Sequence, residues 1–308
     1  MTRLRTYFHP DYAPDDVPSL ARLGAAARHL RELGLADVVA PPELDRAALH
    51  GLHSERYLDA FEHGAEPLAS SQGIAWSPRV RDASYAMLAG QLSAVAHALD
   101  HGIAMNLARG FHHAVFERGA GFCPLNGLAF VAHRHPGLKV FVVDCDEHGG
   151  NGTEEYAARL PNLYNASMFG TRFGCVGNAR SWPYEVRLTR DGRRVHLAAL
   201  QHIGGRVREV RPDLLLYQAG ADSHERDPKS RSGFSTRALA ERDLCVFAMA
   251  RRLAIPIVVV VAGGYQDAEA IARINATTVR CAMRVFAHGN RRRTRVRDDR
   301  AGRIVERG

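Results

Sequence analysis

Two carboxylates and an imidazole lie close together after an apolar run of the sequence. The run that starts at Val140 is followed by Asp144, Asp146 and His148, and then by glycines. Alternate residues of an extended segment project to the same side, so Asp146 and His148 can bind one metal ion while Asp144 lies just behind them. This spacing indicates a zinc-type metal site whose third ligand comes from elsewhere in the chain.

Two further apolar runs also end in polar, glycine-rich turns. Residues 214–217 precede a turn that contains Asp222, and residues 255–261 precede a Gly-Gly turn followed by Tyr265. In open α/β sheets, ligands bind outside the carboxyl ends of parallel strands, so we expect these turns to meet in one crevice. Asp222 is then the predicted third metal ligand, and Tyr265 is predicted to face the substrate.

A pair of adjacent histidines, His112 and His113, lies in a fourth segment that begins at Arg109. A zinc ion with three protein ligands keeps one position open for water, and a neutral histidine beside it can take the proton as that water attacks a carbonyl group. A carboxylate behind such a histidine would fix its tautomer and its orientation. Together these residues indicate hydrolysis by a metal-activated water.

The elements that must position these residues follow from hydrophobic periodicity. Apolar recurrence at intervals of three and four predicts helices over 19–33, 82–100, 236–253 and 267–287, with N-caps at Ser19, Asp82, Thr236 and Asp267. Apolar runs predict strands over 103–108, 139–144, 163–168, 213–218 and 256–262. This alternation predicts a three-layer α/β fold, in which a mostly parallel sheet has helices on both faces.

The positive charge of the chain is concentrated near its C-terminus. Residues 290–308 hold eight arginines against three acidic residues, which is +5 of the net charge of +8. We predict a basic, disordered tail there and a single catalytic domain over 1–289, and we regard nucleic-acid binding as disfavoured. The five scattered cysteines, the missing signal region and the missing membrane span predict a cytoplasmic protein with free thiols and no membrane contact.

The ordered motifs resemble those of the histone deacetylase superfamily, in particular its short bacterial and class IV-like members, over about residues 1–289. The resemblance is carried by the segments His53-Ser-Glu-Arg-Tyr57-Leu, Gly-Phe-His112-His113-Ala, Gly-Phe122-Cys, Asp144-x-Asp146-x-His148-x-Gly-Asn151-Gly, Gly-Ala-Asp222 and Gly-Gly-Tyr265. It implies the arginase-deacetylase fold with an eight-stranded sheet. It also implies a zinc-dependent amide hydrolase that removes acetyl or other short acyl groups from lysine or a lysine-like amine.

The resemblance also assigns roles to individual residues. Asp146, His148 and Asp222 would bind one Zn²⁺ per chain, with Fe²⁺ as the other ion considered. The metal would polarise the acyl carbonyl and activate water, His113 would act as general base and then as acid, and Tyr265 would donate a hydrogen bond to the oxyanion. The remaining catalytic positions form two pairs, in which Asp144 backs His112 and Asn151 backs His113.

Outside the centre, the resemblance places Gly121 and Phe122 at a narrow acyl-lysine tunnel and Lys229 at its rim. A lysine there would repel a polycation, so acetylpolyamines are disfavoured as substrates. Ser167 would help to bind a monovalent cation, K⁺, beside Asp144. The sequence leaves open the acyl group, its carrier (a protein or a small acylated amine) and the formation of homo-oligomers.

The sequence leaves open three alternatives to a deacetylase. An arginase-like dimanganese hydrolase shares the fold but needs further aspartates, and Gly150 and His224 stand near where those ligands would be expected. A catalytically weak or inactive acyl-lysine or metabolite binder would retain the fold, although such a protein would typically have lost a ligand, a histidine or Tyr265. A structural or nucleic-acid-binding protein would use the arginine-rich tail.

Overall fold

A computed structural model describes residues 3–187 and 192–287 of the chain. Its centre is an eight-stranded sheet in which every neighbouring pair of strands is parallel. The strands, in order across the sheet, are β2 (Ala36–Val39), β1 (Leu4–Tyr7), β3 (Ile103–Asn106), β8 (Ile257–Val260), β7 (Leu214–Gln218), β4 (Val140–Asp144), β5 (Leu163–Phe169) and β6 (Ser181–Glu185). The central strands β3, β8, β7 and β4 are buried along their whole length, which explains why they read as continuous apolar runs. The predicted fold class is confirmed.

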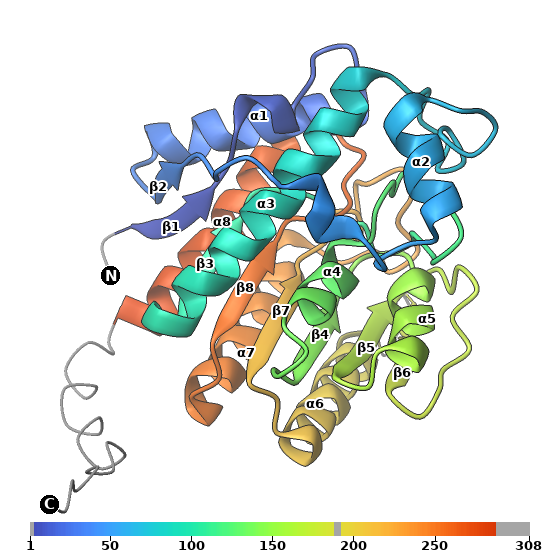
Figure 1. Ribbon diagram of the computed structural model, residues 1–308. Coiled ribbons are helices and arrows are strands. Elements are labelled where there is room, and N and C mark those ends of the chain that lie inside the picture. The colour runs from blue at the N-terminus through green and yellow to red at the C-terminus, as the bar shows by residue number, and fades with distance from the viewer. Residues whose placement is uncertain (1–2, 188–191, 288–308) are drawn as a thin grey trace, which may run out of the picture.

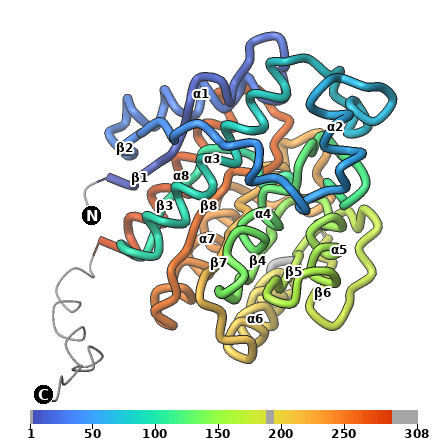
Figure 2. Tube along the Cα trace, viewed as in Figure 1, coloured from blue at the N-terminus to red at the C-terminus, as the bar shows by residue number. Residues whose placement is uncertain are grey.

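Helices cover both faces of this sheet (Figure 1). The helices are α1 (Pro18–Glu32), α2 (Glu55–His63), α3 (Pro78–His101), α4 (Gly127–Arg134), α5 (Asn151–Arg159), α6 (Gly192–Val210), α7 (Thr236–Leu253) and α8 (Ala268–Phe286), with short 3₁₀ helices η1 (Pro10–Tyr12) and η2 (Arg46–Leu49). One layer consists of α3, α4 and α5, and the other of α6, α7 and α8 with α1 packed on α8. Figure 2 shows α1 and α8 side by side although they come from opposite ends of the domain, so the two ends close one core.

The register of the sheet brings the ends of four central strands into one row. Asn106 of β3 lies opposite Val260 of β8, Val260 lies opposite Gln218 of β7, and Gln218 lies opposite Asp144 of β4. Because these strands are parallel, the chain leaves all four at the same edge of the sheet. The segments that follow carry the predicted zinc ligands, both histidines and Tyr265, so the fold brings these residues together.

The predicted helices are correct to within a few residues, but three of their four predicted N-caps are wrong. Residues Val17, Ser77 and Ser235 occupy those positions in place of Ser19, Asp82 and Thr236, whereas Asp267 caps α8 as predicted. Proline stands in the first turn of both α1 and α3, where its fixed φ and missing N–H are tolerated. The apolar periodicity alone predicted the starts of α1 and α3 too late, and these prolines mark the actual starts.

The cysteines and the apolarity of the helices bear on two further predictions. All five cysteines are free thiols, as predicted, and four of them are buried. Among the described residues, no helix combines the length and apolarity that crossing a lipid bilayer requires. The cytoplasmic location stays a prediction. The predicted tail over 290–308 and the boundary at 289 lie outside the described residues.

A buried arginine on α7 fixes the loops behind the site. Arg242 is fully buried, and its Nη1 donates to the carbonyl oxygens of Cys145 (3.0 Å) and Gly220 (2.8 Å), which lie in the loops after β4 and β7. Its guanidinium also pairs with Asp243 at 3.0 Å, and Asp243 accepts hydrogen bonds from Tyr217 and Thr278. Arg242 therefore links the two loops that carry the candidate metal ligands.

We expect Arg242→Met to lower the free energy of unfolding by about 3–5 kcal/mol, because it leaves the Asp243 carboxylate buried without its cation. Urea denaturation followed by circular dichroism measures this loss. The matched control is Arg237→Met on the same helix, whose side chain is exposed and whose loss should cost within about 0.5 kcal/mol. Equal losses in the two variants would contradict the role given to Arg242.

Candidate active site

Three side chains converge where β4 and β7 end. The nearest ligand atoms of Asp146, His148 and Asp222 all lie within 4.8 Å of one another. His148 Nδ1 is 3.4 Å from Asp146 Oδ1 and 3.4 Å from Asp222 Oδ2. Zinc bonds of about 2.0–2.1 Å in a tetrahedral arrangement place ligand atoms about 3.4 Å apart. The two nitrogen-to-oxygen separations therefore fit one small divalent ion.

Backbone amides orient the two carboxylates and leave one oxygen unsatisfied. Asp146 accepts hydrogen bonds from the amides of His148 (3.0 Å) and Gly263 (2.8 Å), and Asp222 Oδ1 accepts one from Glu147 N at 3.0 Å. Asp222 Oδ2 is buried and accepts no hydrogen bond from any described residue. Its ion-pair partner, His148 Nδ1, lies 3.4 Å away, beyond a short hydrogen bond, and a bound cation would satisfy this oxygen.

Gly263 is required for this close approach. A Cβ atom at this position would collide with the carboxylates of both Asp222 and Asp146. The residue before it, Ala262, has a φ of 54°, a left-handed value that a residue with a side chain rarely adopts. The Gly-Gly turn after β8 thus packs against the candidate metal ligands Asp146 and Asp222, and Tyr265 follows at the same site.

Burial and mutual repulsion shift the pKa values of this triad. Burial and the neighbouring charge of Asp146 raise the pKa of Asp222 to about 7. Burial opposes the charged form of His148, but both carboxylates outweigh this effect and raise its pKa to about 10. The pKa of Asp146 is held well below its usual value, because the charges of His112 and His148 outweigh its burial. The triad therefore retains a proton near pH 7, and a divalent cation would compete with it.

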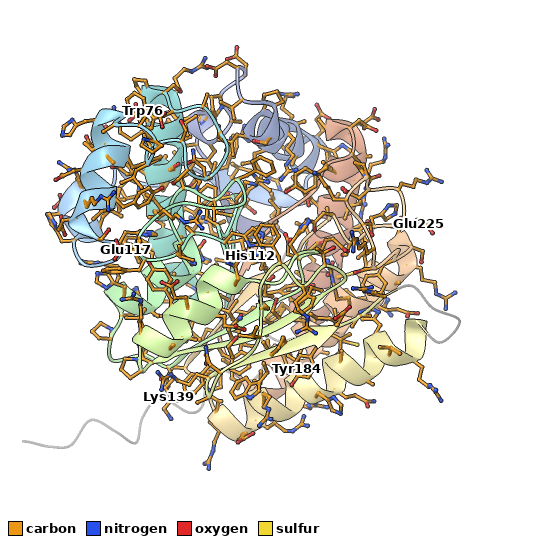
Figure 3. The ribbon with its side chains drawn as sticks, turned by 90° about the vertical axis from the view of Figure 1, so that its right-hand side faces the viewer. Trp76, His112, Glu117, Lys139, Tyr184 and Glu225 are labelled. Atoms are coloured by element: carbon orange, nitrogen blue, oxygen red, sulfur yellow. The ribbon has the colours of Figure 1, made fainter. Side chains whose placement is uncertain are left out.

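The two adjacent histidines are distinguished by their hydrogen-bond partners. His112 Nδ1 lies 2.7 Å from Asp144 Oδ2, and His113 Nδ1 lies 2.7 Å from Asn151 Oδ1. Because an amide oxygen only accepts, His113 Nδ1 carries the proton and its Nε2 is left as an acceptor. Figure 3 shows His112 in the interior of the molecule, whereas Lys139 and Glu225 lie at its periphery.

This difference in partners appears in the pKa values. Burial disfavours the charged form of His112, but the charges of Asp144 and Asp146 outweigh it and raise the pKa of His112. Burial and the neighbouring His112 lower the pKa of His113 well below its usual value. His113 is therefore the neutral proton acceptor of the pair, and His112 is the one that favours a positive charge.

Aromatic rings enclose the approach to this centre. The Phe122 ring lies 6.3 Å from the Tyr265 ring, and the Phe173 ring lies 4.0 Å from the His113 ring. Gly121, which precedes Phe122, stands against the His113 ring, which a Cβ atom there would strike. Phe173 was missed in the sequence because no motif surrounds it. Its half-exposed side chain and its φ of 45° become visible only in the structure.

Tyr265 is positioned by a residue that sequence reasoning also missed. Asp227 Oδ2 accepts a hydrogen bond from Tyr265 N at 2.6 Å, and its Oδ1 accepts one from Lys229 N at 2.9 Å. Lys229 is exposed, and its Nζ lies 5.7 Å from the centre of the Tyr265 ring. Burial raises the pKa of Tyr265, so its hydroxyl stays protonated and can donate. Lys229 is thus exposed beside Tyr265, and its position at the rim of a substrate tunnel stays a prediction.

Ser167, the predicted cation ligand, and His53, of the first matching motif, make other contacts. Ser167 is paired with Asp144 across β5 and β4, and its hydroxyl oxygen accepts a hydrogen bond from Gly150 N at 3.1 Å. The K⁺ site predicted there stays a prediction. His53 is buried away from the triad, where it accepts a hydrogen bond from Asn126 N and lies 2.8 Å from the Val115 carbonyl oxygen, so it stabilises the fold.

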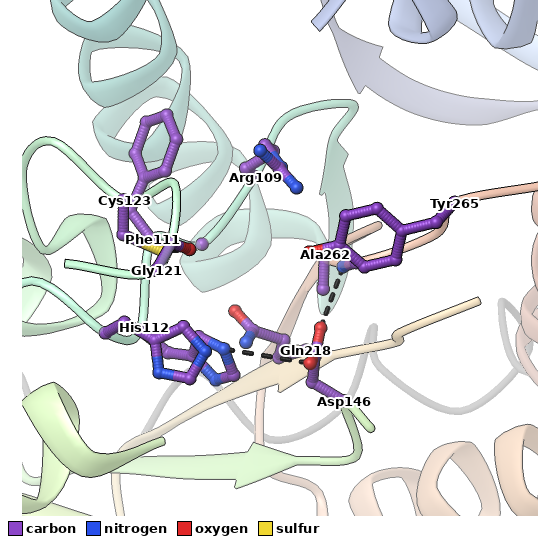
Figure 4. Close-up of a pocket in the computed structure, with 12 residues that line it drawn as sticks. Arg109, Phe111, His112, Gly121, Cys123, Asp146, Gln218, Ala262 and Tyr265 are labelled. Atoms are coloured by element: carbon purple, nitrogen blue, oxygen red, sulfur yellow. Dashed lines mark hydrogen bonds and ion pairs between the residues drawn. The ribbon is translucent and has the colours of Figure 1, made fainter. Parts of the chain in front are cut away.

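A small cavity opens beside Asp146 and His112 (Figure 4), and His113 also lines it. Tyr265 and Gln218 line it, together with Arg109, which leaves β3 ahead of the histidine pair. Gln218 and Arg109 were not among the predicted site residues, although Arg109 belongs to the histidine segment.

The chain is similar in sequence or in fold to several known proteins. The chain is 31% identical over 280 residues to an uncharacterized protein of Picosynechococcus sp., an alignment that covers 84% of this chain and 91% of that protein. It is 27% identical to histone deacetylase 2 of Arabidopsis thaliana over 76% of this chain and 64% of that protein. The crystal structure of an acetylpolyamine aminohydrolase from Burkholderia pseudomallei has the same fold, with a TM-score of 0.75 and 20% identity over 92% of this chain and 99% of that chain.

The family model of the histone deacetylase domain matches residues 17–282. This range contains all three candidate metal ligands, both histidines and Tyr265. The chain belongs to the histone deacetylase superfamily.

Proposed function

We propose that this protein is a zinc-dependent amide hydrolase that removes acetyl or other short acyl groups from lysine or a lysine-like amine. The observation that carries the proposal is the arrangement of two unlike histidines beside a three-ligand cluster. One histidine is held against a carboxylate and the other against an amide oxygen, at equal distances of 2.7 Å. A site that only bound an acylated amine would not need this difference in proton affinity.

The residues divide the reaction between them. A divalent ion held by Asp146, His148 and Asp222 would supply Lewis-acid polarisation of the acyl carbonyl and activation of water. His113 Nε2 takes the proton of the attacking water and then delivers it to the leaving amine nitrogen. The Tyr265 hydroxyl donates a hydrogen bond to the oxyanion that develops on the acyl oxygen. His112, paired with Asp144, supplies a positive charge beside the same centre.

The donor set supports zinc as the ion. Two carboxylate oxygens and one imidazole nitrogen match the ligands of catalytic zinc sites, which keep one position open. Fe²⁺ accepts the same ligands and is the other ion we consider. The proposed K⁺ site at Ser167 and Asp144 would lie behind the ligands and act on the reaction only through Asp144.

A second metal ion and an arginase-like reaction have less support. Within residues 3–187 and 192–287, Asp146, His148 and Asp222 are the only group of metal-type ligands that cluster in this way. Gly150 has no side chain that could bind a metal ion. His224 Nε2 lies 3.0 Å from Thr236 Oγ1, and its Nδ1 accepts a hydrogen bond from the backbone amide of Arg226. A non-catalytic acyl-lysine binder is also less well supported, because His113 and Tyr265 both retain the environment that catalysis needs.

The carrier of the acyl group is constrained by Lys229. Its ammonium group lies 5.7 Å from the centre of the Tyr265 ring, so a substrate with further positive charges would approach this cation. We propose that the protein acts on acyl-lysine in a peptide or on a small acylated amine and discriminates against acetylpolyamines. The related B. pseudomallei enzyme is named for acetylpolyamines, which makes this contrast measurable.

Metal affinity should depend on pH. Because the triad without metal carries at least one proton below pH 10, zinc binding should release a proton and weaken about tenfold for each unit of pH lost between 8 and 7. Below the pKa of about 7 for Asp222 the loss should become steeper. Competition with a chelator, corrected for the chelator's own protonation, measures this dependence. A constant affinity across this range would contradict the proton-bearing triad.

Tyr265→Phe should lower kcat for an acetyl-lysine peptide by about 10²–10³-fold, because one oxyanion donor is lost. The metal content and the midpoint of thermal unfolding should stay those of the parent, since the hydroxyl binds neither a ligand residue nor the core. Steady-state kinetics with elemental analysis of the same samples test both statements. A variant that keeps its full turnover would remove Tyr265 from the mechanism.

Lys229→Glu should raise the kcat/KM ratio of an acetylpolyamine to an acetyl-lysine peptide by roughly tenfold, because it reverses a charge within Coulomb range of the substrate amines. Lys229→Gln should give an intermediate ratio, which separates charge from shape. The effect should shrink as salt is added. Identical ratios for the parent and both variants would show that Lys229 does not select the carrier.

A further inference from the structure

The cavity beside the metal ligands contains a buried guanidinium that the proposed reaction does not use. Arg109 lies three residues before His112 and is 6% exposed. Its Nη1 is buried and donates to no described residue. The side chain lines the cavity together with Tyr265 and Gln218 (Figure 4). A buried cation that points into a cavity without a partner indicates a missing anionic or strongly polar ligand.

A second unsatisfied group faces the same space. Gln218 ends β7, is 1% exposed, and its Oε1 receives no hydrogen bond from the described part of the chain. This oxygen can only accept a hydrogen bond, so the donor that the cavity offers to an anion is Arg109 Nη1. The cavity is also lined by His113, Asp146 and Tyr265, which we propose act on the acyl carbonyl, whereas Lys229 is not among its lining residues.

The local balance of charge favours an anion at this place. Arg22, also 6% exposed, donates from Nη2 to the Ala262 carbonyl oxygen at 3.0 Å and lies 5.6 Å from the centre of the Tyr265 ring. Neither Arg22 nor Arg109 forms an ion pair within residues 3–187 and 192–287.

The nearby carboxylates are already engaged. Asp146 and Asp222 would face a divalent ion, and Asp144 is paired with His112. With the metal in place, two guanidiniums remain buried without a counter-ion, and burying an uncompensated charge is costly. A carboxylate bound in the cavity would neutralise one of them through a charge-assisted hydrogen bond.

We propose that Arg109 binds the free carboxylate of a short dicarboxylic acyl group such as succinyl, so that the protein removes acidic acyl groups in preference to neutral ones of the same length. This inference rests on the proposed function and names its substrate class. In the reaction, water adds to the acyl carbon, the C–N bond breaks, the amine nitrogen takes the proton from His113, and a dicarboxylic acid leaves. The carboxylate released from any acyl group has the same chemistry and is the other source to be distinguished.

The test compares two acyl groups of nearly equal shape on one lysine peptide. Succinyl ends in a carboxylate, and 4-oxopentanoyl carries a methyl ketone in its place. The parent protein should have a higher kcat/KM for the succinyl peptide, and Arg109→Met should lower the succinyl to 4-oxopentanoyl ratio on the order of 10–100-fold. Arg109→Lys should keep part of the preference. Arg118→Met, at an exposed arginine of the same segment, is the matched control and should keep the parent ratio.

A binding measurement separates this inference from the proposed function. Succinate and acetate are titrated by calorimetry into the zinc-loaded parent and into zinc-loaded Arg109→Met, with thermal unfolding as the check of the fold. Succinate should bind the parent at least tenfold more tightly than the variant. If no amide is hydrolysed but succinate binding still depends on Arg109, the proposed function fails and the carboxylate site stands.

Two outcomes overturn the inference. One is a parent protein with no preference for succinyl, or a preference that Arg109→Met leaves unchanged. The other is acetate binding that depends on Arg109 without any succinyl preference, which would assign the guanidinium to the product carboxylate and not to substrate selection.

Discussion

Two buried carboxylates, Asp146 and Asp222, face each other where β4 and β7 end, and their mutual repulsion is the constraint that the site is built to manage. They are held together by the parallel register of the strands, by backbone amides and by the Arg242 bridge between the loops behind them. Without a cation, the triad keeps a proton. With a divalent ion, the same geometry becomes an electrophilic centre that faces the histidine pair.

The surrounding groups gain their roles from this centre. The Asp144 carboxylate favours a positive His112, whereas the neutral Asn151 amide leaves His113 free to accept a proton. The remaining positive charge is placed unevenly, with Lys229 exposed beside Tyr265 and Arg109 buried in the cavity. We propose that Lys229 acts on the carrier of the acyl group and Arg109 on the acyl group itself, so that one site would select both halves of its substrate.

Much of this arrangement was predictable from the sequence, because local signals carry it. The apolar runs predicted the central strands, and the polar residues just after them predicted the candidate metal triad. The residues that were missed act over long sequence distances. Arg22 contacts the carbonyl of Ala262, and Asp227 fixes Tyr265 from another turn. Neither contact leaves a periodic pattern, and the same holds for Phe173, which reaches His113 from an irregular loop.

We propose that Asp146, His148 and Asp222 hold one catalytic ion for amide hydrolysis. Elemental analysis of the purified protein, paired with hydrolysis of acyl-lysine peptides and with Asp222→Ala as the blank, tests this proposal. We expect about one zinc or iron ion per chain and turnover of at least one amide, with both lost in Asp222→Ala. A stoichiometric ion without turnover of any amide, or turnover that survives Asp222→Ala, would contradict it.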